Sequence, residues 1–196
     1  MAARSEEGRR ADELAAQAAG GCSASFESLV ALVGPRLLRF LVRRIGDAHA
    51  AEDALQETLL RAYRGLGGYD PSRSVTAWLF AIATRQVVQH WRSRRPVVPL
   101  EAVDPPADAT AGALDGLVNA EHRQGVWRAA AAELNDEQYA ALWMRYAEGL
   151  AVRDIADSLG KTAGSVKVML HRACRKLMQC GSPAIEPAAQ TQEVQP

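Results

Sequence analysis

The sequence predicts an all-α protein with two helical domains joined by a flexible linker, for three reasons. Apolar residues recur every three or four positions over most of the chain, which is the period of an amphipathic helix. Strand signals are missing, because no run alternates β-branched and polar residues between hairpin turns. A Pro/Ala/Asp-rich segment without an amphipathic period, residues 96–117, separates residues 1–95 from residues 118–180. The proline-containing tail, residues 181–196, is expected to be disordered.

Local signals place the first helices. A short helix is expected over Asp12–Ala19. The next one has Ser25 as its N-cap and Pro35 as a kink or local break, and it ends at Gly46. The residues that recur along its apolar face are Phe26, Leu29, Val30, Val33, Leu37, Phe40, Leu41 and Ile45.

Two more helices complete the first domain. Asp47 can cap a helix that stops at Gly65–Gly68, and its apolar face includes Ala51, Ala54 and Ala62. A loop follows, and Ser74 can cap a third long helix that extends to Arg95. We therefore expect the first domain to be a helical bundle.

The second domain shows a helix-turn-helix pattern. A helix over Val118–Leu134 precedes Asn135–Gln138, which has the form of a capping box and begins the helix continuing over Tyr139–Ala147. A short helix, Val152–Leu159, is then followed by a turn at Gly160. The last helix runs over Ala163–Gln179, with Thr162 as its possible cap, so the second domain ends in a helix-turn-helix.

Composition excludes several classes of protein. No run of 18 apolar residues exists, and the charged N-terminus has no apolar segment behind it, which argues against a membrane span or a secretory signal. Three cysteines are too few and too scattered for a disulfide framework or a zinc site, even with His171 one turn from Cys174. We expect a cytoplasmic protein with no cofactor and no metal.

The net charge is zero, yet the charges are unevenly distributed. Between Pro71 and Leu100 there is no acidic residue but five arginines, and between Ser158 and Ile185 there are again five basic residues and no acid. Two acid-free basic blocks suit contacts with a polyanion such as nucleic acid. A solvated helix face gives the same pattern, so charge alone leaves both interpretations open.

The last helix has the two-sided character of a DNA-recognition helix. Its apolar face, which should pack on the preceding short helix, consists of Val166, Leu170, Ala173 and Leu177. Its opposite face carries Ser165, Lys167, Val168, His171, Arg172 and Arg175. Such a helix can enter a major groove while its back stays anchored. An ordinary surface helix of a bundle is the alternative, but the short helix and the Gly160 turn favour DNA binding.

Two helices of the first domain carry further candidates. The third helix has the basic residues Arg85, Arg92, Arg94 and Arg95. Its Trp91 could offer a ring face to an unpaired base, whereas Trp78 fits the apolar stripe and is expected in the core. The second helix has an acidic patch around Glu52 and Asp53, which suits a protein partner or a solvated face.

Together these segments resemble the extracytoplasmic-function group of bacterial RNA polymerase sigma factors, in the sigma-70 family. In the first domain, the segments that carry the resemblance are Asp12–Leu14, Gly20–Glu27, Ala51–Leu59, Tyr69–Pro71 and Ala77–Ala83. In the second, they are Gly149–Leu150, Asp154–Ala156, Leu159–Gly160, Gly164–Lys167 and Leu170–Ala173. The resemblance therefore spans sigma regions 2 and 4.

The resemblance implies a role for each surface. The β′ clamp helices of core RNA polymerase would be bound by Glu52, Asp53, Leu55, Gln56, Glu57 and Leu59. The −10 promoter element would be bound by Tyr69, Asp70, Arg73, Trp78, Arg85, Trp91, Arg92, Arg94 and Arg95. The −35 element would be bound by Lys161, Ser165, Lys167, Val168, His171, Arg172 and Arg175.

The resemblance also implies the partners of the chain. Region 4 would contact the β flap of the polymerase, and one copy of the chain, monomeric when free, would bind one polymerase and promoter DNA. An anti-sigma factor is a further expected partner. A sigma factor performs no chemistry itself, because nucleotide addition belongs to the core enzyme.

Several positions depart from the family pattern. Thr84-Arg85 stands where the family has Arg-Asn, Val168-Met169 where it has Ser-Arg, and Cys174 where it has Arg. Two expected phosphate donors of the last helix are therefore missing, which predicts a shifted −35 preference or weaker backbone binding. Lys161, at a usually apolar position, would compensate in part.

The leading alternative is a repressor or activator that binds DNA without polymerase. The helix-turn-helix alone permits this function, and a dimer on a palindromic site would be its mark. The acidic helix and the second nucleic-acid candidate argue against it. An enzyme has little support, because the sequence has no glycine-rich phosphate loop and no nucleophile–base motif.

Overall fold

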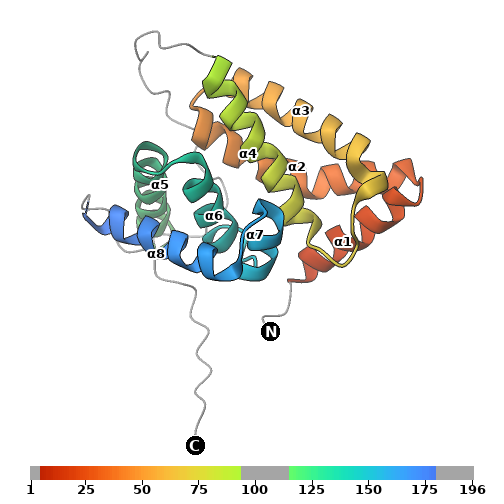
Figure 1. Ribbon diagram of the computed structural model, residues 1–196. Coiled ribbons are helices and arrows are strands. Elements are labelled where there is room, and N and C mark those ends of the chain that lie inside the picture. The colour runs from red at the N-terminus through yellow and green to blue at the C-terminus, as the bar shows by residue number, and fades with distance from the viewer. Residues whose placement is uncertain (1–4, 94–114, 180–196) are drawn as a thin grey trace, which may run out of the picture.

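The computed structural model describes residues 5–93 and 115–179, with side chains from residue 124 onward in the second range. All regular structure within these ranges is helical, as the sequence predicts (Figure 1). The N-terminal group consists of α1 (Glu6–Ala19), α2 (Ser23–Ile45), α3 (Ala48–Gly65), a single 3-10 turn (Leu66–Gly68) and α4 (Val75–Ser93). The C-terminal group consists of α5 (Asp115–Glu133), α6 (Asp136–Tyr146), α7 (Val152–Leu159) and α8 (Ala163–Gln179).

Most helix ends follow the local chemistry that the sequence predicts. Gly46 ends α2 in the left-handed conformation, with φ 78°, and its N–H donates to the Val42 carbonyl. The Asp47 carboxylate accepts a hydrogen bond from the Ala50 N–H at 3.0 Å and so caps α3. Asn135 and Gln138 form the predicted capping box of α6, which confirms the boundary between α5 and α6.

The beginning of α2 differs from the prediction, and of the two effects expected at Pro35, a kink or a local break, the break does not occur. Cys22, not Ser25, occupies the N-cap position, and Ser25 is buried inside the helix, where its hydroxyl donates to Gln17 Oε1 at 2.8 Å. The Ser25 prediction is wrong because α2 begins two residues earlier, at Ser23, and the Ser25 hydroxyl contacts Gln17 of α1 and Cys22 Sγ at 3.2 Å. The helix also continues through Pro35 without a break. Pro35 is exposed, and loss of one N–H is tolerated in a long helix packed on its other side.

The first helix begins earlier than predicted. It starts at Glu6 because the Ser5 side chain accepts a hydrogen bond from the Gly8 N–H at 3.1 Å. Further along, α2 lies against α1, α3 and α4, and its residues Leu37 and Leu41 are fully buried. The N-terminal group is therefore a bundle with α2 as its central helix.

The apolar cores of the two helix groups are continuous. The Phe40 ring of α2 lies 5.4 Å from the Phe80 ring of α4 in an edge-to-face arrangement. The same ring lies 5.6 Å from Tyr139 and 5.8 Å from Trp143, both on α6. Aromatic contacts at these distances contribute energy beyond the buried area. The two predicted helical domains therefore meet across an aromatic cluster.

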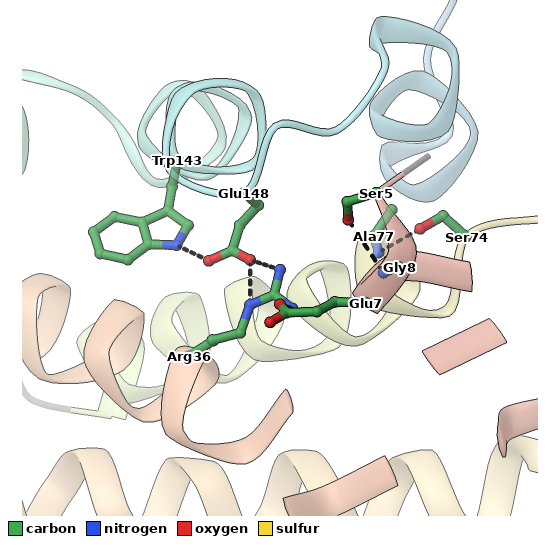
Figure 2. A network of polar contacts seen from close by, with 8 residues as sticks. All are labelled: Ser5, Glu7, Gly8, Arg36, Ser74, Ala77, Trp143 and Glu148. Atoms are coloured by element: carbon green, nitrogen blue, oxygen red, sulfur yellow. Dashed lines mark hydrogen bonds and ion pairs between the residues drawn. The ribbon is translucent and has the colours of Figure 1, made fainter. Parts of the chain in front are cut away.

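Two arginines of α2 bridge to the C-terminal group. Arg36 donates from Nε to Glu148 Oε2 at 2.7 Å, and Glu148 Oε1 accepts the Trp143 Nε1–H at 3.1 Å (Figure 2). Arg44 pairs with Asp136, donates to the Leu134 carbonyl at 2.9 Å, and lies over the Tyr139 ring. Most of these buried polar groups therefore have direct hydrogen-bond partners across the junction, and Arg36 Nη1 is the exception.

Candidate nucleic-acid and protein interfaces

The helix-turn-helix is formed by α7, a turn and α8. Gly160 adopts φ 65°, which a glycine tolerates without strain, and reverses the chain after α7. Thr162 Oγ1 accepts a hydrogen bond from the Ser165 N–H at 3.2 Å, so it caps α8 as predicted. The back of α8, Val166, Leu170, Ala173 and Leu177, is buried as predicted. This anchorage fixes which side of α8 faces outward.

The outward side of α8 presents most of the predicted −35 residues. The exposed ones are Ser165, Lys167, Val168, His171, Arg172 and Arg175. Lys161 differs, because it is half-buried and its Nζ lies 3.1 Å from Glu137 Oε2. An ion pair to Glu137 competes with any contact of Lys161 to a DNA phosphate. The basic front of α8 is thus available to a ligand, and Lys161 is engaged within the protein.

The loop before α4 is held by its own side chains. The Asp70 carboxylate accepts the Ser72 N–H at 3.0 Å, and this contact with Ser72, reinforced by Arg73, lowers the pKa of Asp70. The Tyr69 hydroxyl donates to the Arg73 carbonyl at 2.7 Å. Tyr69 is buried, so its ring supports the loop and is not presented to a ligand in this structure. Asp70 and Arg73 are exposed, as are the other residues of the loop 67–73 apart from Tyr69.

An unpredicted residue, Asp12 of α1, holds the start of α4. Its Oδ1 accepts the Val75 N–H at 2.8 Å, while Ser74 Oγ accepts the Ala77 N–H at 3.3 Å. Carboxylates at a helix N-terminus satisfy free N–H groups and complement the helix dipole. The two residues lie 63 positions apart, so no local pattern could have revealed the contact.

The described aromatic and basic residues of α4 lie in three places. Trp78 is half-buried against the Tyr69 ring at 5.4 Å, which places it in the bundle rather than on an open surface. Trp91 is exposed near the end of the helix. Arg85 and Arg92 line a cavity of about 480 Å³ whose far wall includes Leu159 of α7. Arg94 and Arg95 lie outside the described residues.

The outward side of α3 has an acidic half and an apolar half. Glu52, Asp53 and Gln56 are exposed, whereas Leu55, Glu57 and Leu59 are half-buried. Beyond them, Leu60 and Tyr63 are exposed, and the Tyr63 ring lies 5.1 Å from the Phe26 ring of α2. Sequence analysis missed Tyr63, although its place at the end of an amphipathic helix was a signal. An exposed apolar area beside acids suits a protein partner.

Two tyrosines of the C-terminal group have raised pKa values. Burial, opposed by nearby Arg43 and Arg44, raises the pKa of Tyr139. Burial and contact with the Cys174 thiol, at 3.7 Å, raise the pKa of Tyr146 to about 12. Cys174 therefore faces Tyr146 rather than His171. Over residues 5–93 and 115–179, no three His, Cys, Asp or Glu side chains gather as metal ligands, and no helix could cross a membrane.

Both helix groups match known families. Residues 29–97 match Sigma-70 region 2, and residues 125–177 match Sigma-70 region 4. SigL of Mycobacterium tuberculosis, an ECF RNA polymerase sigma factor, is 36% identical over 151 residues, which cover 72% of this chain and 80% of SigL. BldN of Streptomyces coelicolor, another ECF sigma factor, is 32% identical over 84% of this chain, and this match covers 63% of BldN.

A solved structure shows the same architecture. The sigma factor RpoE of Bartonella quintana, crystallised with the anti-sigma factor NepR, aligns with a TM-score of 0.62 and 25% sequence identity. The alignment covers 79% of this chain and 94% of that chain. The similarity therefore includes helices from both groups described above.

Proposed function

Because this chain belongs to the extracytoplasmic-function (ECF) group of sigma-70 RNA polymerase sigma factors, we propose the following assignment of its surfaces. The chain binds core RNA polymerase and directs promoter-specific transcription initiation. The outward side of α3 binds the β′ clamp helices, the loop 67–73 with α4 binds the −10 element, and α8 binds the −35 element.

The observation that carries this proposal is the division of α8. Its apolar back is buried against the rest of the helix-turn-helix, while its basic front is exposed. A helix anchored in this way can place its N-terminal residues in a major groove. Region 2 in the same chain supports a sigma factor over a regulator that acts without polymerase.

The α3 surface supports binding to a protein. Its acidic residues, among them Asp53, are exposed, and the apolar pair Tyr63 and Phe26 continues the surface at one end. Anchoring aromatic residues beside charged side chains are typical of protein interfaces. We assign this surface to the β′ clamp helices, and region 4 to the β flap.

The −10 assignment requires the two helix groups to separate. Arg85 and Arg92 are exposed, and they line the cleft of about 480 Å³ that α7 borders. The two promoter elements lie about 25 base pairs apart, or about 85 Å along B-DNA at 3.4 Å per base pair. In the structure, α4 and α8 both pack on α6, which keeps their axes within about 20 Å at usual interaxial distances. The chain therefore contacts both elements only after the junction opens.

The remaining assignments follow from the family. We assign no catalytic step, cofactor or metal to this chain, because the polymerase performs the chemistry. We place it in the cytoplasm, where it would meet the polymerase, and we expect a monomer when free. RpoE of Bartonella quintana binds an anti-sigma factor, so we propose a partner of that class here.

Co-elution with core RNA polymerase on a sizing column tests the α3 assignment. Wild type is expected to co-elute, and Asp53→Arg is expected to elute separately. Glu13→Arg is the matched control, because it makes the same charge change at an exposed residue of α1, which packs on α2 and α4. If Asp53→Arg co-elutes as well as the control, the α3 assignment fails. If folded wild type does not co-elute, polymerase binding itself fails.

A further inference from the structure

An apolar side chain stands in the middle of the basic front of α8. Val168 is 50% exposed, although its neighbours on the surface, Lys167, His171 and Arg172, are polar or charged. Single exposed apolar residues are common on protein surfaces. The position of Val168 within the helix, rather than its exposure alone, makes it a candidate for contact with DNA.

Helix geometry places Val168 directly opposite the anchored back of α8. Each residue turns the helix by about 100°, so Val168 lies about 200° around the axis from the buried Val166. Leu170, Ala173 and Leu177 lie close to Val166 in direction and are also buried. The Val168 side chain therefore points away from the protein, along the direction in which a recognition helix meets DNA.

The turn before Val168 leaves room for a close approach. Gly164 lies four residues earlier on the same outward line of the helix. A Cβ at Gly164 would meet nothing closer than Thr162 Oγ1 at 4.0 Å, so this part of the surface is open. Because the N-terminal turns of a recognition helix contact base edges, the bare backbone at Gly164 lets Val168 reach into the groove.

The chemistry of valine restricts what it can recognise there. Its side chain has no hydrogen-bond donor or acceptor, so it cannot distinguish bases by hydrogen bonding. In the major groove, the apolar feature of the standard bases is the C5-methyl group of thymine. Contact between the valine side chain and the thymine methyl group removes apolar surface of both from water.

The surroundings of Val168 argue against a protein-docking role. The other large exposed apolar residue of α8, Met178, lies ten residues further on and about 80° around the axis, so the two form no common patch. The side chains beside Val168 are cationic or polar, which suits a phosphate-lined groove.

We propose that Val168 determines specificity at one thymine of the −35 element by contacting the thymine C5-methyl group. This inference rests on the proposed function, in which α8 enters the major groove of that element. It gives a chemical basis for the shifted −35 preference that the sequence predicts from valine at this position.

Replacement of thymine by deoxyuracil tests the inference, because it removes the methyl group and keeps the base pair. Promoter fragments are first selected by the full-length chain with core polymerase from DNA with a randomised −35 region. Each −35 thymine is then replaced singly, and holoenzyme binding is measured. We expect one replacement to weaken binding about fourfold, as for loss of one buried methyl group. Val168→Ser should bind both forms equally, whereas Val168→Thr, which keeps a methyl group, should retain discrimination.

Met178→Ala is the matched control, since it truncates an exposed apolar residue of the same helix outside the proposed contact. It should discriminate as wild type does, and circular dichroism should show all variants folded. The inference is overturned if selected −35 elements contain no thymine, if no replacement weakens wild-type binding, or if Val168→Ser still discriminates. Selection that shows no −35 preference at all would overturn the proposed function of α8 as well.

Discussion

Replacement of Glu148 by alanine should destabilise the whole protein through the junction between the helix groups. The Glu148 side chain is only 3% exposed and its partner Arg36 only 18%, so the pair is largely removed from water. Truncation removes the buried partner of the Arg36 cation and leaves the Trp143 N–H without its acceptor (Figure 2). Breaking a buried pair costs about 3–5 kcal/mol. Arg36 keeps a contact with Glu7 at 3.7 Å, so we expect the lower part of that range, about 3 kcal/mol.

Urea unfolding of the full-length chain, followed by circular dichroism, measures this loss. The matched control is Arg61→Ala, which breaks a pair with Glu57 at 2.6 Å whose side chains are 45% and 41% exposed. Exposed helix pairs contribute about 0.3–0.5 kcal/mol, so the control should change stability little despite its short distance. Adding Arg36→Met to Glu148→Ala should restore about 1 kcal/mol or more, because it removes the unpaired charge. Equal losses of unfolding free energy for Glu148→Ala and Arg61→Ala would refute the reasoning that burial determines how much the Arg36–Glu148 pair contributes to stability.

Three further substitutions test separate features. Tyr139→Phe should raise the free energy of unfolding by about 1–2 kcal/mol, because the buried Tyr139 hydroxyl has no hydrogen-bond partner. A lower free energy of unfolding, measured by urea titration, would contradict this. Gly160→Ala should lower the free energy of unfolding by about 1–2 kcal/mol, since φ is 65° there, and an unchanged midpoint would show that the turn relaxes. The hydrogen bond from Ser25 lowers the pKa of the exposed Cys22 thiol, so Ser25→Ala should slow alkylation of Cys22 at pH 7.5. Peptide mass spectrometry measures that rate, and equal rates in the two proteins would argue against the effect.

Features set by neighbouring residues were predictable from the sequence. Gly46, Asp47 and the capping box at Asn135 each act within four residues, so the chain itself displays the partners. The bounds of α7 and α8 follow from the turn at Gly160 and the apolar period on either side of it. Local chemistry was therefore enough to predict the helices and the two-sided character of α8.

Contacts between distant residues were not predictable in this way. Ser25 has the sequence signature of a cap, but Gln17 of the neighbouring helix takes up its hydroxyl. Arg36 and Glu148 are separated by 112 positions, and each alone resembles an ordinary surface charge. Side-chain contacts of α2 with α6 and with the turn after it bring them together, so the junction could not be inferred from periodicity or from charge patterns.

The shared aromatic cluster has a consequence for synthesis of the chain. The helices that surround Phe40 within the N-terminal group are complete at Ser93, whereas α6, which covers the other side of that ring, ends at Tyr146. A ribosome adding 5–20 residues per second needs about 3–10 s to make the residues between these points. For that time the nascent N-terminal bundle presents the Phe40 ring and the Arg36 guanidinium to water. A chain that stopped at Ser93 would keep this surface open permanently.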